Sequence, residues 1–375
     1  MAETEEMFGN RLAEAVTQGF LCLALSLGHR TGLLETMAGF DEPKTAKEIA
    51  TAAGLKERYV REWLGAMVAG YVVEVDEETS ELFSLPQHRR SAVTRLGDIV
   101  DWSMVAQGLP AMAGVHEKVA DCMKASGPSG IPGTEYTSSY RSWRDQCYET
   151  FVQTSLLEAM VPSIPGLESL LEQETEVLEI NTHTGSAARK LARAYPESRF
   201  HLCNLPRPGA SLDGQQSASS TAPPTRPLSA GASPYRLFNL TEEGVLDPAQ
   251  LPSDWSGRFG VVLAMQNVRD APRPDALARE ALRVLRPGGL FALMESNTRA
   301  RLADNRDNPT AVCVYTSSLY SSLPLSLSDG DGLGIGAAYG REAFKPLLES
   351  AGFASVNLVP VPGDPLDSVT YVCQK

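Results

Sequence analysis

The stretch that decides the fold is Glu176-Val-Leu-Glu-Ile-Asn-Thr-His-Thr-Gly185, together with the segment that follows it. Its run from Val177 to Ile180 is short, largely apolar and β-prone. Gly185 permits a tight turn, and Ser186–Tyr195 predicts a helix. A strand, a turn and a helix in this order present backbone N–H groups to a ligand at the edge of an α/β sheet.

Further strands are expected downstream of this unit. The β-prone runs cover residues 200–205, 235–240, 258–265, 354–361 and 368–373. Helices are predicted at 274–285 and 339–353, and the last two strands are expected to pair antiparallel. Residues 206–234 are rich in Pro, Ser and Ala without a helical period, so we expect a flexible loop there.

A second informative segment is Arg283-Val-Leu-Arg-Pro-Gly-Gly-Leu-Phe-Ala-Leu-Met294. Pro287 is expected to end the preceding helix, the glycine pair after it to make the turn, and Leu290–Met294 to form a buried strand. A helix ending in Leu-Arg-Pro-Gly-Gly before an apolar strand resembles class I S-adenosylmethionine (SAM)-dependent methyltransferases. The resemblance covers about residues 15–375 and implies an α/β fold with a Rossmann-like sheet.

The resemblance implies that the cofactor lies over the first strand–turn–helix unit. The family usually carries an acid-x-Gly-x-Gly-x-Gly pattern there. This chain keeps Glu179 and Gly185 but has Asn181 and His183 where the family has its other two glycines. Since glycine lets a cofactor approach the backbone closely, these two side chains occupy space that the family leaves open.

Two later strand ends also depart from the family pattern. The acid that usually accepts the ribose hydroxyls of SAM falls at Asn204, and the acid that meets the adenine amino group falls at Asn239. Hydrogen bonds to a charged acceptor are worth roughly 1.5–3 kcal/mol, and a neutral amide gives up part of this. The cofactor-binding residues that the resemblance implies are Glu179, Asn181, His183, Gly185, Asn204, Asn239, Leu240 and Gln266.

The sequence identifies no catalytic base. The resembling family tends to have His-Asp after the fourth strand, and this chain has Arg269-Asp270. Tyr320 and Ser321 stand where the family tends to place a His-Cys pair facing the substrate, although helix packing explains them equally well. His183 is the one histidine on a predicted ligand-facing turn, where a solvated histidine is the simpler interpretation. The candidates are therefore Asp270, Tyr320 and His183.

The N-terminal part predicts a winged helix. Thr45 with Glu48 fits a capping box at a helix start, and Gly54 fits the turn to a second helix. Residues 71–85 then predict a hairpin, which completes the motif. Acidic residues interleave with the basic ones and dominate the wing, which disfavours DNA reading. The Arg58–Leu64 segment resembles the N-terminal domain of a bacterial-type class I methyltransferase family that also occurs in some animals.

Helices are expected on both sides of this motif. Residues 8–38 are apolar on more than one face, which suits either a core helix or packing in a dimer. Residues 98–125 predict another helix, and 153–172 a last one that prolines interrupt. The aromatic-rich span 136–151 is either a core between domains or a lid over the cofactor and substrate pocket.

Bulk properties narrow the class of protein. At 375 residues the chain is long enough for two domains. The formal net charge of -13 disfavours nucleic acid and anionic membranes as partners, and no apolar run is long enough to span a bilayer. The six cysteines form no CxxC pair, so no metal site is expected. The N-terminus lacks a signal-peptide pattern, so we expect a cytoplasmic protein with reduced thiols.

We therefore expect a winged-helix and dimerisation domain at 1–97, a helical connector and pocket lid at 98–172, and a Rossmann-like SAM-methyltransferase domain at 173–375. The first functional hypothesis is SAM-dependent methyl transfer to a small molecule by a homodimer. The second is a degenerate methyltransferase fold, a pseudoenzyme that binds another ligand or a protein. The third is a DNA-binding regulator.

Overall fold

The computed structural model describes residues 3–95, 100–180, 184–204, 235–239, 251–265, 268–364 and 367–375, with the backbone alone at 204 and 235–239. The chain divides into two compact units. The first comprises residues 1–114 and 138–150, and the second comprises 115–137 and 151–375. The predicted loop at 206–234 lies outside the described residues.

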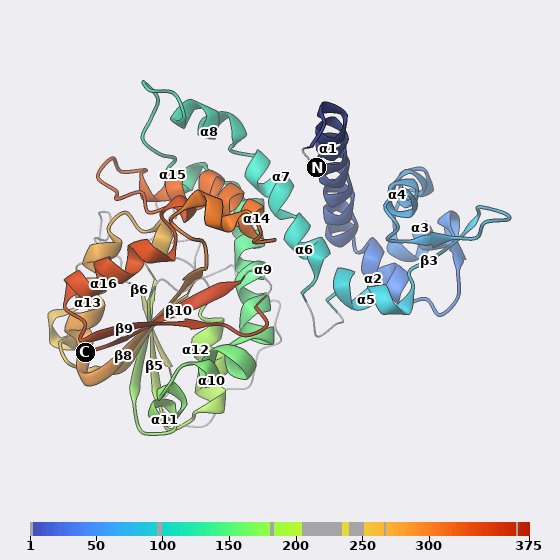
Figure 1. Ribbon diagram of the computed structural model, residues 1–375. Helices are drawn as coiled ribbons and strands as arrows, with labels where there is room; N and C mark the ends of the chain where they lie inside the picture. Colours follow the sequence, from blue (N-terminus) through green and yellow to red (C-terminus); the bar gives the residue numbers. More distant parts are fainter. Residues whose placement is uncertain are drawn as a thin grey trace. The chain divides into compact units, whose positions relative to one another are not determined.

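The first unit contains a winged helix (Figure 1). Its helices are α1 (Glu5–Thr31), α2 (Leu33–Ala38), α3 (Ala46–Ala53), α4 (Glu57–Ala69), α5 (Gln87–Val93), α6 (Trp102–Ala106), α7 (Gly108–Ala113) and most of α9 (Ser138–Thr154). Its strands β1 (Lys44–Thr45), β2 (Glu74–Val75) and β3 (Leu82–Ser84) form an antiparallel sheet in the order β1-β3-β2.

Local signals set the helix ends in this unit. Thr45 and Glu48 form the predicted capping box at the start of α3, and Gly54 ends that helix in the left-handed region at φ 66°. The single helix predicted at 8–38 is wrong, because Gly32 adopts φ 73° and separates α1 from α2. The helix predicted at 98–125 is likewise divided into α6, α7 and α8 (His116–Cys122).

The second unit is built on a mostly parallel sheet. Within the described residues, seven strands lie in the order β6-β5-β4-β7-β8-β10-β9, and β10 runs antiparallel to both of its neighbours. The strands are β4 (Glu176–Ile180), β5 (Arg199–Asn204), β6 (Tyr235–Asn239), β7 (Phe259–Met265), β8 (Leu285–Ser296), β9 (Ser355–Pro360) and β10 (Ser368–Gln374). The predicted α/β class and the final antiparallel pair are confirmed.

The second unit also contains helices, several of which pack on this sheet. They are α8, η2 (Leu156–Met160), α10 (Val161–Ser163), α11 (Leu167–Leu171), α12 (Ser186–Ala194), α13 (Pro274–Val284), α14 (Ala311–Ser317), α15 (Leu323–Ser326) and α16 (Phe344–Ala351). In Figure 1, α13 and α16 lie side by side, and they pack on β8 and β9. Phe259, Phe291, Phe344 and Tyr371 are fully buried in this core.

In the aromatic-rich span 136–151, Tyr136, Tyr140, Tyr148 and Phe151 are buried as well.

Two predicted boundaries are wrong for physical reasons. The strand expected at 290–294 begins at Leu285, because Leu285 already pairs with Phe259 of β7 before the register shifts. The helix expected at 339–353 begins at Phe344, because Gly340 has φ 65° and two short 3-10 turns precede it. The predicted helix end at Gly352 is confirmed, with φ 106°. No helix in the described ranges has the length and apolar character needed to cross a membrane.

A close contact joins α1 to α4 in the first unit. The indole Nε1 of Trp63 donates to the carbonyl of Ala24 at 2.9 Å. Gly28 lies one turn further along α1, and a Cβ there would be 2.7 Å from Trp63 Cζ2 and 3.2 Å from Leu34 Cδ1. Since both neighbours belong to a packed core, only a residue without a side chain fits this position.

We expect Gly28→Ala to destabilise the first unit by about 1–3 kcal/mol, because the added methyl group overpacks this contact. Gly19→Ala is the matched control, since a Cβ at Gly19 of the same helix meets nothing within 4 Å. That variant is expected to be unchanged or more stable by up to about 1 kcal/mol, because alanine favours a helix over glycine. Urea unfolding of both variants measures the difference, and equal midpoints would contradict the packing account.

Candidate functional site

The carboxyl ends of the central strands come together at one edge of the sheet. The strand order reverses between β4 and β7, with β5 and β6 on one side and β8 on the other, which is where α/β sheets bind ligands. Ile180 at the end of β4 lies opposite Cys203 of β5 and Ala264 of β7. Asn204 and Asn239 are direct partners at the ends of β5 and β6. The backbone therefore gathers several of the predicted cofactor residues at this edge.

Four of the eight predicted cofactor-binding residues lie in the described part of the chain. Glu179, Gly185, Asn204 and Asn239 belong to the strand ends and the turn just described. The other predicted positions, Asn181, His183, Leu240 and Gln266, lie outside the described residues.

Glu179 ties β4 to the helix that follows it. Its side chain is 2% exposed, and its Oε2 accepts a hydrogen bond from the backbone N–H of Ala188 at 3.1 Å. Gly185 is the N-cap of α12 with φ 72°, and Ser186 N donates to Thr184 Oγ1 at 3.3 Å. A carboxylate at a helix N-terminus is stabilised by the exposed N–H groups and by the helix dipole. At least one oxygen of Glu179 thus serves the fold of the strand–turn–helix unit.

An ion pair occupies the position that the resemblance assigns to a base. Arg269 lies on the short helical turn η5 (Val268–Asp270), directly after β7, and Glu295 lies near the end of β8. The two residues are 5% and 3% exposed. Glu295 Oε1 accepts from Arg269 N at 3.1 Å, and Glu295 Oε2 lies 3.1 Å from Arg269 Nε. Because a guanidinium stays protonated in proteins, Arg269 cannot act as a proton acceptor.

The protonation of Glu295 is set by this environment. Burial raises the pKa of Glu295, the nearby Asp270 raises it further, and Arg269 partly opposes both. The sequence reasoning named Asp270 and overlooked Glu295. The signal that was available is an acid near the end of an apolar strand, in Met294-Glu295-Ser296.

Tyr320, a predicted catalytic candidate, is paired with a histidine that the sequence did not single out. The hydroxyl of Tyr320 on η7 (Ser318–Ser322) lies 2.6 Å from Nδ1 of His116, and the two rings stack with centroids 5.9 Å apart. The hydroxyl of Tyr136 donates to the carbonyl of Tyr320 at 2.9 Å. Since η7 packs against η5, this pair belongs to the same end of the sheet as Arg269.

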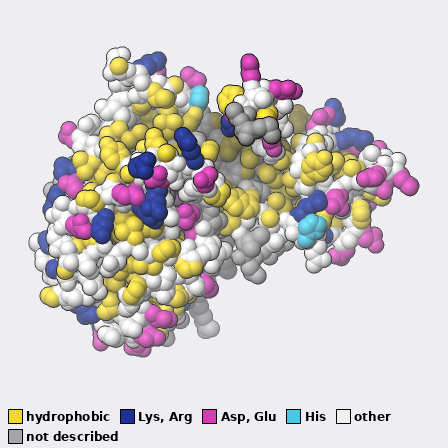
Figure 2. Space-filling model, viewed as in Figure 1, with side chains coloured by type: hydrophobic (Ala, Val, Ile, Leu, Met, Phe, Trp, Pro, Cys, Tyr) yellow, Lys and Arg dark blue, Asp and Glu magenta, His cyan; other side chains and the backbone are white. Residues whose placement is uncertain are grey.

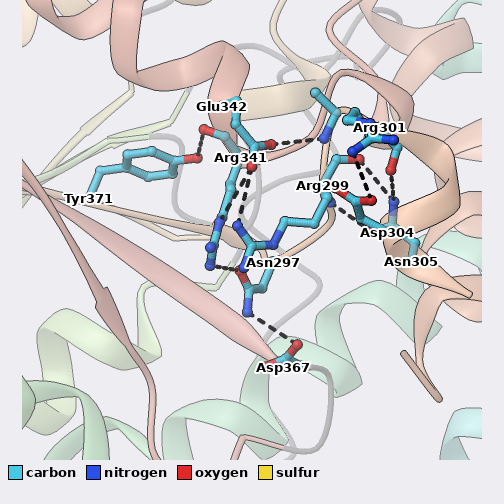
Figure 3. Close-up of polar contacts among 10 residues, drawn as sticks. Asn297, Arg299, Arg301, Asp304, Asn305, Arg341, Glu342, Asp367 and Tyr371 are labelled. Atoms are coloured by element: carbon cyan, nitrogen blue, oxygen red, sulfur yellow. Dashed lines mark hydrogen bonds and ion pairs between the residues drawn. The ribbon is translucent and has the colours of Figure 1, made fainter. Parts of the chain in front are cut away.

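A polar network fixes the chain where it leaves β8 (Figure 3). Asn305 accepts from Arg299 N at 2.7 Å through its Oδ1 and donates to the carbonyl of Arg299 at 2.9 Å. Arg341 Nη1 donates to Asn297 Oδ1 at 2.6 Å, and the hydroxyl of Tyr371 donates to the carbonyl of Arg341 at 2.5 Å. The segment that follows Glu295 is thereby held in one conformation.

Glu342 connects the two halves of this network. Its Oε2 accepts from the backbone N–H of Ala300 at 2.8 Å, and its Oε1 lies 3.4 Å from Arg299 Nη1. Burial alone would raise the pKa of Glu342, but the hydrogen bond from Ala300 and the charge of Arg299 hold it below its usual value. The carboxylate is therefore ionised at neutral pH, where it stabilises this turn.

A separate cluster in the first unit brings together donor types that metals use. His29, Glu35 and Asp101 have side-chain atoms within 4.8 Å of one another among the described residues. Arg95 Nη2 lies 2.9 Å from His29 Nε2, and His29 Nδ1 lies 3.0 Å from Asp101 Oδ2. Because Arg95 has only donors, Nε2 must accept and the proton stays on Nδ1. The imidazole therefore has no lone pair for a metal, and its Nδ1, which also lies 3.1 Å from Ser103 Oγ of α6, links α1 to α6.

Comparisons with known proteins agree with this architecture. Residues 19–95 match the Rv2258c-like winged HTH domain family. Human N-acetylserotonin methyltransferase in complex with SAM is similar in structure, with a TM-score of 0.67 at 14% identity over 100% of this chain and 99% of that one. An O-methyltransferase family protein from Burkholderia thailandensis has a TM-score of 0.64 at 12% identity, over 100% and 99% of the two chains.

A further similar structure is described as a pericyclic reaction enzyme, with a TM-score of 0.58 at 14% identity over 100% of this chain and 90% of that one. A search among curated proteins gave no match. At these sequence identities the structural similarity establishes the fold. It does not establish the reaction, which has to be argued from the residues of the site. The chain therefore has the class I methyltransferase fold, and residues 19–95 within its N-terminal unit form a winged helix that matches the Rv2258c-like domain model.

Proposed function

We propose that the protein binds SAM and transfers its methyl group to a small molecule. The observation that carries this proposal is that β4, Gly185 and α12 lie at the point where the strand order reverses. Structures with the same fold are described as complexes with SAM or with S-adenosylhomocysteine (SAH). When bound, SAM supplies an electrophilic methyl group.

The described residues suit such a cofactor, but we expect them to bind it more weakly than the family's usual residues do. The turn at Gly185 and the start of α12 lie where the resemblance puts the cofactor's amino-acid end, and Asn204 and Asn239 lie at the strand ends that the resemblance assigns to its ribose and its adenine. Both asparagines offer a carbonyl oxygen without charge, so each contact is weaker than one made by a carboxylate. Because about 1.4 kcal/mol is tenfold in affinity, two such losses move a micromolar site towards millimolar.

A second candidate function is a ligand-binding fold that no longer transfers methyl groups. The observation that favours it is the buried pair of Arg269 and Glu295 at the base position, since Arg269 cannot accept a proton from a methyl acceptor. The pericyclic reaction enzyme among the similar structures is a precedent for chemistry other than methyl transfer on this fold. A DNA-binding role is less well supported, because acidic side chains gather at the tip of the β2–β3 hairpin (Figure 2).

The proposed assembly is a homodimer formed through α1. Large apolar side chains of this helix are exposed in the single chain: Met7, Phe8, Leu12, Val16, Phe20, Leu23 and Leu27. From Phe8 to Leu27 they recur every three or four residues and form one stripe. A continuous exposed apolar stripe is the kind of surface that a second copy of the helix covers.

Isothermal titration with SAM and SAH tests the cofactor proposal. We expect binding between micromolar and millimolar, and we expect Asn204→Asp to strengthen it about tenfold, because it restores a charged acceptor. Asn357→Asp is the matched control, since it adds the same charge at an exposed position of β9. The triple variant N181G/H183G/N204D should bind more tightly still. An absence of heat at millimolar ligand for all of these proteins would refute SAM binding.

Sedimentation velocity at micromolar concentration tests the dimer. We expect the wild type to sediment as a dimer and the variant F20D/L27E to sediment as a monomer, because two charges on the stripe oppose its burial. Val312→Asp is the control, since Val312 is an exposed apolar residue of α14 in the second unit and lies outside the stripe. A monomeric wild type would dispose of the proposed assembly.

A further inference from the structure

Arg269 has hydrogen-bonding capacity that the fold does not use. Its Nε lies 3.1 Å from Glu295 Oε2 without the geometry of a hydrogen bond, and its Nη2 is buried with no acceptor among the described residues. The guanidinium carbon lies 5.8 Å from the centroid of the Phe344 ring, so one face of the group is covered by an apolar side chain. A buried donor left without a partner is costly, most of all when it carries a charge.

Tyr315 is a second unused donor close by. Tyr315 lies on α14 and is half-buried as a whole. Its hydroxyl oxygen is buried and has no hydrogen-bond partner in the part of the chain that the structure describes. Burial raises the pKa of Tyr315, the charge of Arg269 lowers it in part, and Glu342 raises it again. The phenol therefore lies within the electrostatic reach of the guanidinium.

Both donors belong to the ligand end of the sheet. The turn η5, which carries Arg269, directly follows β7 where the strand order reverses. The helix α14, which carries Tyr315, continues into η7, and η7 packs on η5. Two donors without an acceptor thus lie beside the position expected for a ligand, and an acceptor group of the ligand would complete both.

On the basis of the proposed small-molecule function, we propose that Arg269 and Tyr315 bind an anionic oxygen of the ligand, either a carboxylate or an ionised phenol or enol. A planar guanidinium suits such an oxygen because its N–H groups donate charge-assisted hydrogen bonds. Glu295 holds the other edge of the guanidinium and keeps the group in place. If the ligand is a methyl acceptor, Arg269 lowers its pKa, so the acceptor loses its proton to solvent before methyl transfer and a histidine base is then not needed.

The test measures binding of four simple probes by isothermal titration. Cinnamate and cinnamamide are a charged and a neutral version of one skeleton, and 4-nitrophenolate and 4-nitroanisole are the same for the phenol. We expect the wild type to bind at least one charged probe about tenfold or more tightly than its neutral counterpart. Preference for cinnamate assigns a carboxylate, and preference for 4-nitrophenolate assigns a phenol or enol.

Two variants assign the binding to these residues. Tyr315→Phe leaves the ion pair intact and is expected to weaken the charged probe about two- to tenfold. R269M/E295L replaces both partners of the buried pair by apolar side chains, which avoids an unpaired charge, and should abolish the preference for charge. The controls are Tyr339→Phe and Arg273→Met, which change exposed residues of the same unit and should bind as the wild type does.

The possible outcomes distinguish the proposed oxyanion site from the proposed SAM-dependent function. Wild-type protein that binds neither charged probe, or binds charged and neutral probes alike, overturns the inference, as does unchanged binding by both variants. Titration with SAH is run on the same samples. SAH binding without a preference for charge refutes only the oxyanion site, whereas a preference for charge without SAH binding refutes only the SAM-dependent function.

Discussion

The hydrogen bond from Ala188 N to the carboxylate of Glu179 holds together the unit on which the ligand end of the sheet depends. It joins a parallel strand that is buried from Val177 to Ile180 to the first turn of α12, and Gly185 can then reverse the chain in the left-handed region. The position of α12 follows from this contact, and α12 in turn packs on β5. One buried carboxylate therefore sets the geometry that presents backbone N–H groups at the strand ends.

The ion pair of Arg269 and Glu295 differs from the hydrogen bond at Glu179 because its contribution to stability does not explain its presence. Two buried charges are expensive to desolvate, and replacing such a pair with apolar side chains is often neutral or stabilising. Stability alone is thus a poor reason for its presence at the end of β7 and β8. Within the part of the chain that the structure describes, Nη2 of Arg269 has no acceptor, which the fold does not require and a ligand would explain. For this reason we interpret the pair as part of the site.

Much of the fold follows from local patterns in the sequence. The capping box of Thr45 and Glu48, the turn at Gly54 and the apolar strands of the sheet each depend on a few neighbouring residues, and each was predicted. The break at Gly32 was missed, because the apolar pattern continues across it while the backbone does not. Periodicity reports which side chains are apolar and gives little information on where the backbone changes direction.

The site was predicted less completely than the fold, because its contacts join distant parts of the chain. Glu295 meets Arg269 across two neighbouring strands, and His116 meets Tyr320 across 204 positions. Spacing in the sequence has no signal for such pairs until the topology is known. Asn204 and Asn239 do lie at adjacent strand ends, since parallel strands bring their carboxyl ends to one edge, while their role toward a cofactor stays a prediction.

The buried core favours the fold, whereas polar side chains near the strand ends influence which ligand can bind. Phe259, Phe291 and Tyr371 are fully buried within the unit, and their packing favours this fold whatever lies at the ends of the strands. Polar side chains that follow the strands are not part of that apolar packing, so they can change with less effect on the fold. By the resemblance, Asn204 stands where the family usually has an acid, and Arg269 stands where the family tends to have a histidine. Both changes make the site less negative, and a less negative site attracts an anionic ligand more strongly.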